Sequence, residues 1–206
     1  MAEESRVEFH RGVVDDVPAL AELQFFSPSR EAVAMAGSVG QAQQFWAGLL
    51  SRSLVDGTAE VLIVELDGTT VGFAELSRGG DIPSFGVVAR CAINSMGVLG
   101  ALGAGWRARA RSAVDIQPPA GVHLVELQIA PQHRNAGLGG RLLSEVERTA
   151  GQEGAPRLSL TTAIDNPARR LYERHGFHVE AEKRDDRYEA MTGSPGRVLM
   201  VKTLAT

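Results

Sequence analysis

Regularly spaced hydrophobic residues at the beginning of the chain predict a strand followed by a helix. Over residues 6–13, Val7 and Phe9 alternate with polar neighbours, which is the two-residue period of a half-buried strand. Asp15 or Asp16 can begin a helix, since Pro18 suits its first turn. Three apolar side chains follow at helical spacing, namely Leu20, Leu23 and Phe26.

A second helix is expected over residues 41–54. Its apolar residues Phe45, Leu49 and Leu50 recur on one face, as in an amphipathic helix. The preceding residues, 27–40, lack such a period, and we interpret them as a loop.

Two apolar runs after this helix predict a β-hairpin. The runs cover residues 61–64 and 71–76, and Asp67 and Gly68 lie between them. An Asp-Gly pair readily adopts the positive φ angles of a tight turn, so the two runs are expected to pair antiparallel.

Residues 78–121 follow a looser pattern and predict a long insertion that contains one helix. Its apolar stretch, residues 91–106, is shorter than the ~20 residues needed to span a bilayer. We therefore expect this stretch to be buried or at an interface, without membrane contact. Three arginines follow, and they either meet an acidic acceptor or form the solvated basic end of the helix; they are Arg107, Arg109 and Arg111.

The last third of the chain has the clearest periodicity. A β-rich run ends before Pro131, an amphipathic pattern covers residues 138–150, and residues 158–162 again read as a strand, which predicts a β-α-β unit. A short helix is expected between Asn166 as its cap and Gly176 as its left-handed end. Two strands complete the chain, over residues 177–181 and 198–203.

Composition and charge narrow the class of protein. The 206 residues are 44% hydrophobic and 22% charged, which fits one folded domain covering residues 1–206. A net charge of -4 argues against nucleic acid as the main partner. Cys91 is the sole cysteine, so no disulfide or thiolate metal cluster is expected, and the acidic residues 1–5 do not resemble a secretory signal. We expect a cytoplasmic protein without a metal.

A glycine-rich turn between a strand and a helix carries the first candidate chemistry. Residues 134–140, Arg-Asn-Ala-Gly-Leu-Gly-Gly, allow successive backbone N–H groups to point into one concavity at a helix N-terminus. Such a turn binds a pyrophosphate. No Gly-Lys-Ser/Thr follows, which excludes a P-loop, and a dinucleotide fingerprint would need glycine where Leu142 stands. A plain turn without a ligand remains the alternative on this segment alone.

Two longer stretches carry a family resemblance. Residues 127–139, LQIAPQHRNAGLG, and 165–177, DNPARRLYERHGF, resemble the two signature segments of the GCN5-related N-acetyltransferase (GNAT) family. The resemblance implies an α/β (α+β) fold whose mixed, mostly antiparallel sheet is flanked by helices, with the long insertion 78–121 between strands three and four. It also implies acetyl-CoA as co-substrate, an amine acceptor, and an acetyl-CoA-binding core at residues 122–177. Dimerisation is expected from the resemblance alone.

The resemblance assigns roles to residues of both segments. The backbone of Leu127 to Ile129 would pair with the pantetheine arm, and the Ile129 N–H would polarise the thioester carbonyl. Tyr172 would donate a proton to the departing thiolate, although a purely structural core tyrosine is the alternative. The coenzyme-binding set is Leu127, Gln128, Ile129, Arg134, Asn135, Ala136, Gly137, Leu138, Gly139, Gly140, Asn166 and Tyr172.

The general base is left open between two residues of one strand. Glu126 and His123 precede the coenzyme-binding segment, and in a regular strand their side chains lie on opposite faces. A lysine-like amine needs a base more than an α-amine does, because its pKa of ~10.4 leaves little neutral amine at pH 7. A third alternative for the base is that the protein has no dedicated one. For the function as a whole, the alternatives to an acetyltransferase are a non-catalytic acyl-CoA sensor and a dinucleotide-dependent enzyme.

Overall fold

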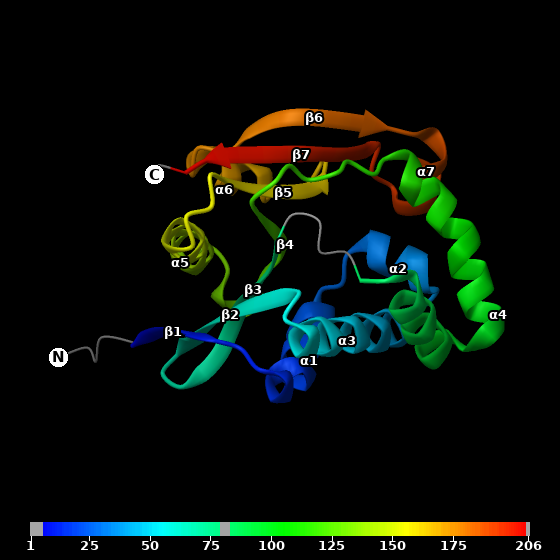
Figure 1. The fold of residues 1–206 in the computed structure, drawn as a ribbon, viewed down its shortest axis with the longest axis horizontal. Coiled ribbons are helices and arrows are strands. Elements are labelled where there is room, and N and C mark those ends of the chain that lie inside the picture. The colour runs from blue at the N-terminus through cyan, green and yellow to red at the C-terminus, as the bar shows by residue number, and fades with distance from the viewer. Residues whose placement is uncertain (1–5, 79–82, 205–206) are drawn as a thin grey trace.

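A seven-stranded sheet organises the residues that the computed structural model describes, 6–78 and 83–204. The strand order is β1-β2-β3-β4-β5-β7-β6, and every neighbouring pair is antiparallel except β4 and β5 (Figure 1). The strands are β1 (Val7–Arg11), β2 (Ala59–Leu66), β3 (Thr69–Arg78), β4 (Val122–Ile129), β5 (Arg157–Ala163), β6 (His178–Arg184) and β7 (Gly196–Thr203). The predicted mixed, mostly antiparallel sheet is confirmed. The acidic residues 1–5 lie outside the described part of the chain.

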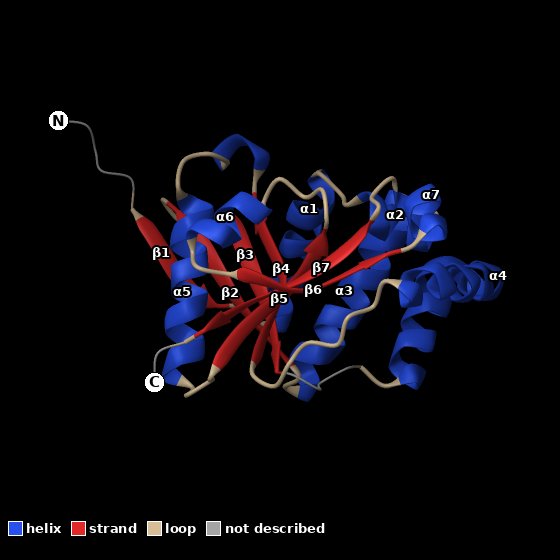
Figure 2. Ribbon diagram, turned by 90° about the horizontal axis from the view of Figure 1, so that it is seen from above, coloured by secondary structure: helices blue, strands red, loops and turns tan. Residues whose placement is uncertain are grey.

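Helices cover both faces of this sheet (Figure 2). The α5 face carries α5 (Leu138–Gln152) and α6 (Arg169–Arg174). The opposite face, called the α3 face below, carries α1 (Val17–Phe26), α2 (Arg30–Ala36), α3 (Val39–Asp56), α4 (Phe85–Ala113) and α7 (Asp186–Thr192). Two short 3-10 helices are η1 (Val14–Asp16) and η2 (Pro131–His133).

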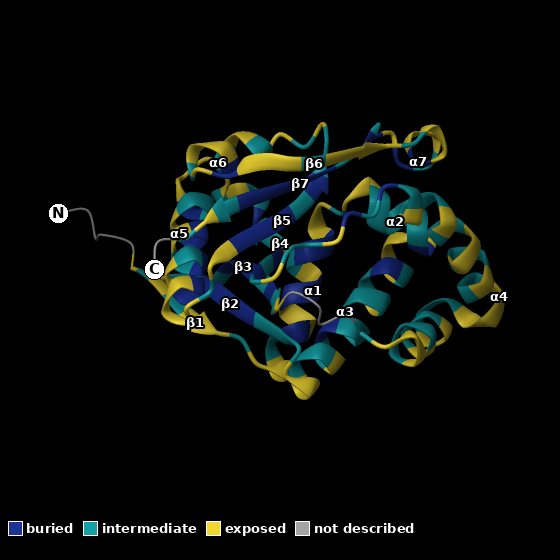
Figure 3. Ribbon diagram, turned by 45° about the horizontal axis from the view of Figure 1, so that its top comes forward, coloured by how far each residue is buried: buried dark blue, intermediate teal, exposed yellow. Residues whose placement is uncertain are grey.

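The core has one layer on each face of the sheet. On the α5 face, Leu142, Leu143 and Val146 are fully buried against the strands, as their helical spacing predicts. On the α3 face, Leu20 and Leu50 pack against the side chains of β2 and β3 that point that way. Figure 3 shows the central strands as the most buried part of the molecule.

The hairpin between β2 and β3 is confirmed together with its turn. Asp67 and Gly68 have φ angles of 51° and 76°, which is the pair of positive values that a type I′ turn requires. The turn fixes the register in which Leu66 faces Thr69, and a β-bulge then shifts the pairing by one residue so that Val64 faces Gly72.

Two short helices were not predicted. α2 lies within residues 27–40, where the sequence indicated a loop; Ser29 caps it by accepting a hydrogen bond from the Ala32 N–H, and Gly37 ends it at φ 100°. α7 lies between β6 and β7, with Asp185 as its cap. Each has seven residues, too few for a helical period to be distinctive. Phe26, expected on the buried face of α1, is 73% exposed.

The helix of the insertion, α4, is bent and lies on the surface. Gly97, at φ 71° and ψ 173°, interrupts its 29 residues, and none of its side chains is buried. Of the two positions expected for residues 91–106, burial is wrong, since Leu99 is 85% and Trp106 77% exposed, whereas a position at an interface stays a prediction. By length and composition alone α4 is apolar enough to cross a membrane, but the bend leaves neither arm with the ~20 continuous residues that a span needs.

An ionic cluster fastens α4 to the rest of the α3 face. Glu31 of α2 accepts hydrogen bonds from Arg111 of α4 at 2.5 Å and from Arg197 of β7 at 2.7 Å, and from the Tyr188 hydroxyl of α7 at 2.7 Å. Arg107 donates to the Met35 carbonyl at 3.0 Å. Two of the three arginines therefore hold the helix in place, while Arg109 is exposed.

Candidate active site

The sheet opens between β4 and β5. The two strands pair only from Val122 to Leu124, opposite Leu158 to Leu160, and then separate, so the last five residues of β4 have no partner on that side. The Ala130 N–H bonds to Val71 of the β3 side. Because N–H groups alternate in direction along a strand, those of Leu127 and Ile129 point into the opening.

A glycine in β3 lets the neighbouring strand approach the opening closely. A Cβ atom on Gly72 would lie 2.6 Å from the Gln128 carbonyl oxygen and 2.5 Å from the Ile129 Cδ1. Any other residue at this position would therefore push β3 away from the residues whose N–H groups line the opening.

The glycine-rich turn lies at the end of the same opening. Asn135 at φ 63° and Gly137 at φ 82° bend the chain into the first turn of α5. Among the described residues, the N–H groups from Asn135 to Gly139 have no hydrogen-bond partner, whereas those of Gly140 and Arg141 bond to the Gly137 carbonyl. Five unpaired donors at a helix N-terminus form a concavity suited to an anion.

The arginines of this turn have different contacts. Arg134 donates from Nε to the Ile129 carbonyl at 3.0 Å, so it joins the turn to the end of β4. The Arg141 guanidinium lies 5.9 Å from the Phe9 ring centre, directed at β1. The Arg134 guanidinium is therefore held at the end of β4 and that of Arg141 beside β1.

Tyr172 lies on the α5 face, in α6, which follows β5. Its side chain is buried, packs edge-on against Phe177 with ring centres 6.0 Å apart, and belongs to the same core cluster as Leu138. Burial, and then the negative charge of Glu126, raise the pKa of the Tyr172 phenol well above its ordinary value of 10. The phenol therefore remains protonated near neutral pH, and it lies within range of the Glu126 charge.

Asn166 shapes the segment that leads into α6. Its Oδ1 accepts from the Ala168 N–H at 2.9 Å, and its Nδ2 donates to Thr162 of β5 at 2.7 Å. The helix itself begins at Arg169, later than predicted, because the residues after Asn166 first form a tight turn closed by the Arg169 N–H and the Asn166 carbonyl. The N-cap of α6 is Ala168, so the predicted capping of this helix by Asn166 is wrong; its side chain stabilises the turn that precedes the helix instead.

His123 and Glu126 lie on the same face of the sheet. β3 pairs Ser77 with His123 and Glu75 with Glu126, so β4 contains one extra residue, Val125, between the pairs. Directly opposed residues share a face, and Ser77 and Glu75 are two residues apart. The expectation of opposite faces is wrong because this β-bulge shifts the alternation by one position.

Glu126 and Glu75 form a cross-strand pair of carboxylates on the α3 face. Burial raises the pKa of Glu126 to about 7, against smaller opposite effects of hydrogen bonding to Gln24 and the charge of Arg197. Burial, and then the charge of Glu126, likewise raise the pKa of Glu75 to about 7. Near neutral pH the pair therefore holds about one proton.

His123 has a different environment. Its Nδ1 lies 2.9 Å from the Ser159 hydroxyl of β5. Burial, assisted by the charge of Arg197, lowers its pKa to about 4. The imidazole is therefore neutral near pH 7 and, in this environment, a weak base.

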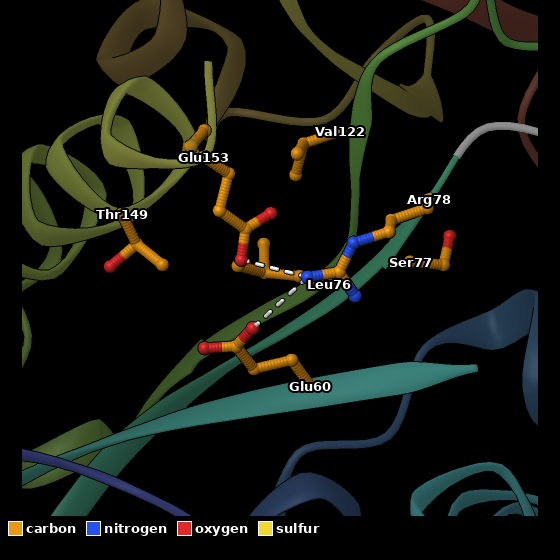
Figure 4. Close-up of a pocket in the computed structure, with 8 residues that line it drawn as sticks. Glu60, Leu76, Ser77, Arg78, Val122, Thr149 and Glu153 are labelled. Atoms are coloured by element: carbon orange, nitrogen blue, oxygen red, sulfur yellow. Dashed lines mark hydrogen bonds and ion pairs between the residues drawn. The ribbon is translucent and has the colours of Figure 1, made fainter. Parts of the chain in front are cut away.

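A small cavity on the α5 face is separate from this arrangement (Figure 4). Arg78 bridges Glu153 at 2.7 Å and Glu60 at 3.8 Å across it. Its volume of about 10 Å³ is that of one water molecule, so it accommodates neither a coenzyme nor an acceptor. In the part of the chain that the structure describes, no three His, Cys, Asp or Glu side chains gather as metal ligands.

Sequence reasoning missed Glu75 and Gln24 as members of the site. Glu75 is an isolated acidic residue in an apolar strand, a signal that the sequence does contain. Its pairing with Glu126 depends on the register of β3 and β4 and on the bulge. Gln24 reaches the site only because α1 packs on the same face.

Comparison with known proteins identifies relatives of the chain. The family model described as "Acetyltransferase (GNAT) family" matches residues 24–177. An uncharacterized N-acetyltransferase of Bacillus subtilis, YhfO, is 29% identical over 166 residues, which cover 80% of this chain and 85% of that protein.

Solved structures share the fold at low sequence identity. The PaiA N-acetyltransferase of Thermoplasma acidophilum, in complex with coenzyme A, has a TM-score of 0.60 and 16% identity, covering 96% of this chain and 99% of its own. The ribosomal-protein-S18-alanine N-acetyltransferase of Escherichia coli has a TM-score of 0.58 and 14% identity. The match covers 98% of this chain and 96% of that protein.

Proposed function

The chain belongs to the acetyltransferase (GNAT) family, and from that premise we propose that it moves the acetyl group of acetyl-CoA directly to a primary amine within a ternary complex. Acetyl-CoA-dependent acetyl transfer follows from the family. The direct route and the roles of individual residues are the parts that we propose here.

The observation that carries this proposal is the opening between β4 and β5. It presents the unpaired N–H groups of Leu127 and Ile129 along one edge, and it ends at the unpaired N–H groups of residues 135–139. An extended amide-containing arm fits the strand edge, since it can complete the missing hydrogen bonds. A diphosphate fits the helix N-terminus. Coenzyme A contains both groups, because its amide-containing pantetheine arm is joined directly to its diphosphate.

The two sides of the opening supply different chemistry. We assign to the Ile129 N–H the stabilisation of negative charge that develops on the thioester oxygen. Tyr172, on the α5 face, keeps its proton until a thiolate forms beside it and then donates that proton to sulfur.

On the α3 face we assign the role of general base to Glu126. Its pKa of about 7 is suited to accepting a proton near neutral pH, and it lies beside the opening. His123, the other candidate, has a pKa of about 4 and is therefore much less basic. Its hydrogen bond to Ser159 holds it at the paired end of β4 and β5.

Purified protein, acetyl-CoA and a panel of amines test the proposal. The panel contains a peptide with a free N-terminus, a lysine peptide, polyamines and aminoglycosides, and free thiol is measured. We expect thiol release that depends on an amine and saturates in both substrates. Coenzyme binding without release across the panel would instead support an acyl-CoA sensor.

A further inference from the structure

Glu75 and Glu126 differ from three other half-buried carboxylates of the chain in having no cationic partner. Glu31 is paired with Arg111 and Arg197, Glu60 with Arg11 and Arg78, and Glu147 with Lys202. Among the described residues, no lysine, arginine or histidine lies within ion-pair distance of Glu75 or Glu126. Two like charges opposed across neighbouring strands destabilise a fold, so this pair is better explained by a ligand than by packing.

An independent polar atom points to the same place. Gln24 of α1 is 7% exposed, its side chain lies close enough to Glu126 to lower the pKa of that carboxyl by hydrogen bonding, and its Oε1 has no partner. The Oε2 of Glu75 is also buried without a partner. Both atoms are acceptors, and the donors they lack are not supplied by the described chain.

Aromatic side chains line the same face beside this pair. Trp46 packs between Phe25 and Phe73, with ring centres 6.2 and 5.6 Å apart, and hydrogen bonding to Trp46 slightly lowers the pKa of Glu75. Aromatic surface beside carboxylates favours a cation that carries hydrocarbon. Water or a metal ion would gain less from such surroundings.

We propose that Glu75, Glu126 and the Gln24 Oε1 together bind the acceptor as an alkylammonium cation. The inference rests on the proposed function and specifies its substrate class: aliphatic primary amines that are protonated in solution. Three oxygen acceptors match the three N–H donors of a primary ammonium group. Glu75 thereby joins Glu126 in contacting the acceptor.

The proton balance of the transfer uses both carboxylates. The bound cation favours the doubly ionised pair, and one ammonium proton moves to a carboxylate, leaving a neutral amine. Nitrogen then bonds to the acetyl carbon as the carbon–sulfur bond breaks, and the sulfur takes the proton of Tyr172. The second nitrogen proton restores Tyr172 through solvent, and the carboxyl proton is later released. One ammonium ion and acetyl-CoA thus give one amide, one thiol and one proton.

Glu75→Gln tests this inference through the basicity of the acceptor. Its kcat/KM is measured for n-butylamine, which is cationic at pH 7.5, and for 2,2,2-trifluoroethylamine, which is mostly neutral. We expect about a 10- to 100-fold loss for n-butylamine, the range for a lost hydrogen bond to a charged group, and a change below about 3-fold for the fluorinated amine. Glu75→Asp should recover part of the n-butylamine rate.

Glu60→Gln is the matched control, because Glu60 is a half-buried carboxylate of the adjacent strand on the α5 face. Glu60→Gln should change kcat/KM by less than about 2-fold for n-butylamine and for 2,2,2-trifluoroethylamine alike. An equal loss for both amines in Glu75→Gln, or no loss for either, overturns the inference while leaving acetyl transfer intact.

A binding measurement separates this inference from turnover. n-Butylammonium chloride should raise the melting temperature of the wild-type protein with coenzyme A more than sodium chloride of equal ionic strength does, and this difference should vanish in Glu75→Gln. A protein that binds the cation but releases no thiol would contradict the proposed function alone. Equal melting temperatures in the two salts would contradict the cation site, whatever the activity.

Discussion

Tyr172 and Glu126 lie on opposite faces of the sheet. Tyr172 packs in the core layer of the α5 face, whereas Glu126 is paired with Glu75 on the α3 face. They remain close enough for the Glu126 charge to raise the pKa of the phenol. Acetyl transfer needs a proton removed from nitrogen and another delivered to sulfur, and the roles that we propose for Glu126 and Tyr172 would separate the two tasks.

Replacing Tyr172 with phenylalanine should lower kcat by about 10²-fold or more, the usual contribution of a positioned proton donor. The ring and its packing against Phe177 are kept, so we expect the affinity for coenzyme A to change by less than about 2-fold. Steady-state kinetics and calorimetric titration measure the two quantities. Unchanged turnover would leave Tyr172 with a purely structural role.

The anion site at the start of α5 predicts a charge-specific effect at Gly139. A Cβ there would lie 3.5 Å from Leu171 and 3.8 Å from Ile129, which are ordinary contacts, so substitution is compatible with the fold. Gly139→Glu should weaken coenzyme A binding about 100-fold, the size of a coupling of roughly 3 kcal/mol, because its carboxylate repels the diphosphate. Gly139→Gln introduces a side chain of similar volume without the charge, so it should weaken coenzyme A binding clearly less than Gly139→Glu does.

Gly151 provides the position control for this experiment. It lies at the other end of α5, and a Cβ there would meet no atom within 4 Å. Gly151→Glu should leave coenzyme A binding unaltered in the same titration. Equal weakening by glutamate and glutamine at position 139 would show that shape, not charge, governs that site.

The pH dependence of kcat/KM distinguishes Glu126 from His123 as the general base. If Glu126 is the base, kcat/KM rises with pH and levels off near 7, because the group must lose its proton before it can accept one. Glu126→Gln should lower kcat/KM about 10²-fold and remove this limb. His123→Asn should keep the limb, with activity within about 3-fold of wild type. Loss of the limb in His123→Asn instead would assign the base to the histidine.

The sequence predicted the strands, the hairpin turn and α5 well, because each has local periodicity or a specific turn pair. The positions of Tyr172, Asn166 and the glycine-rich turn followed from motifs whose spacing is set within one β-α-β unit. By contrast, the pairing of Glu75 with Glu126 depends on the Val125 bulge, and a bulge leaves no mark in a single sequence. The exposure of α4 was missed because apolar composition alone does not show what covers a helix.

The Glu31 cluster should contribute substantially to stability. Glu31→Ala leaves Arg111 and Arg197 without their shared carboxylate, and removal of one partner from such a partly buried cluster costs about 3 kcal/mol. Urea denaturation followed by circular dichroism measures the change. Asp56→Ala removes an exposed partner of Arg52 within α3 and should cost less than about 1 kcal/mol. Similar losses in both variants would contradict this role of the cluster.

The carboxylate pair also predicts how stability depends on pH. Burial raises the pKa of both Glu75 and Glu126 from 4.5 to about 7, so between these values the folded state holds protons that the unfolded chain has released. The free energy of unfolding must therefore fall as pH rises from about 4.5 to 7, on the order of 3 kcal/mol for each fully shifted group.

Glu75→Gln removes one of these groups without changing the size of the side chain. The variant should therefore be more stable than wild type at pH 8, with a smaller difference near pH 5, where Glu75 of the folded wild type is already protonated. Urea midpoints at the two pH values measure the difference. A variant less stable than wild type at pH 8 would mean that the ionised Glu75 is stabilised by contacts within the fold. Greater stability combined with lost alkylamine turnover would show that the pair is retained for its function.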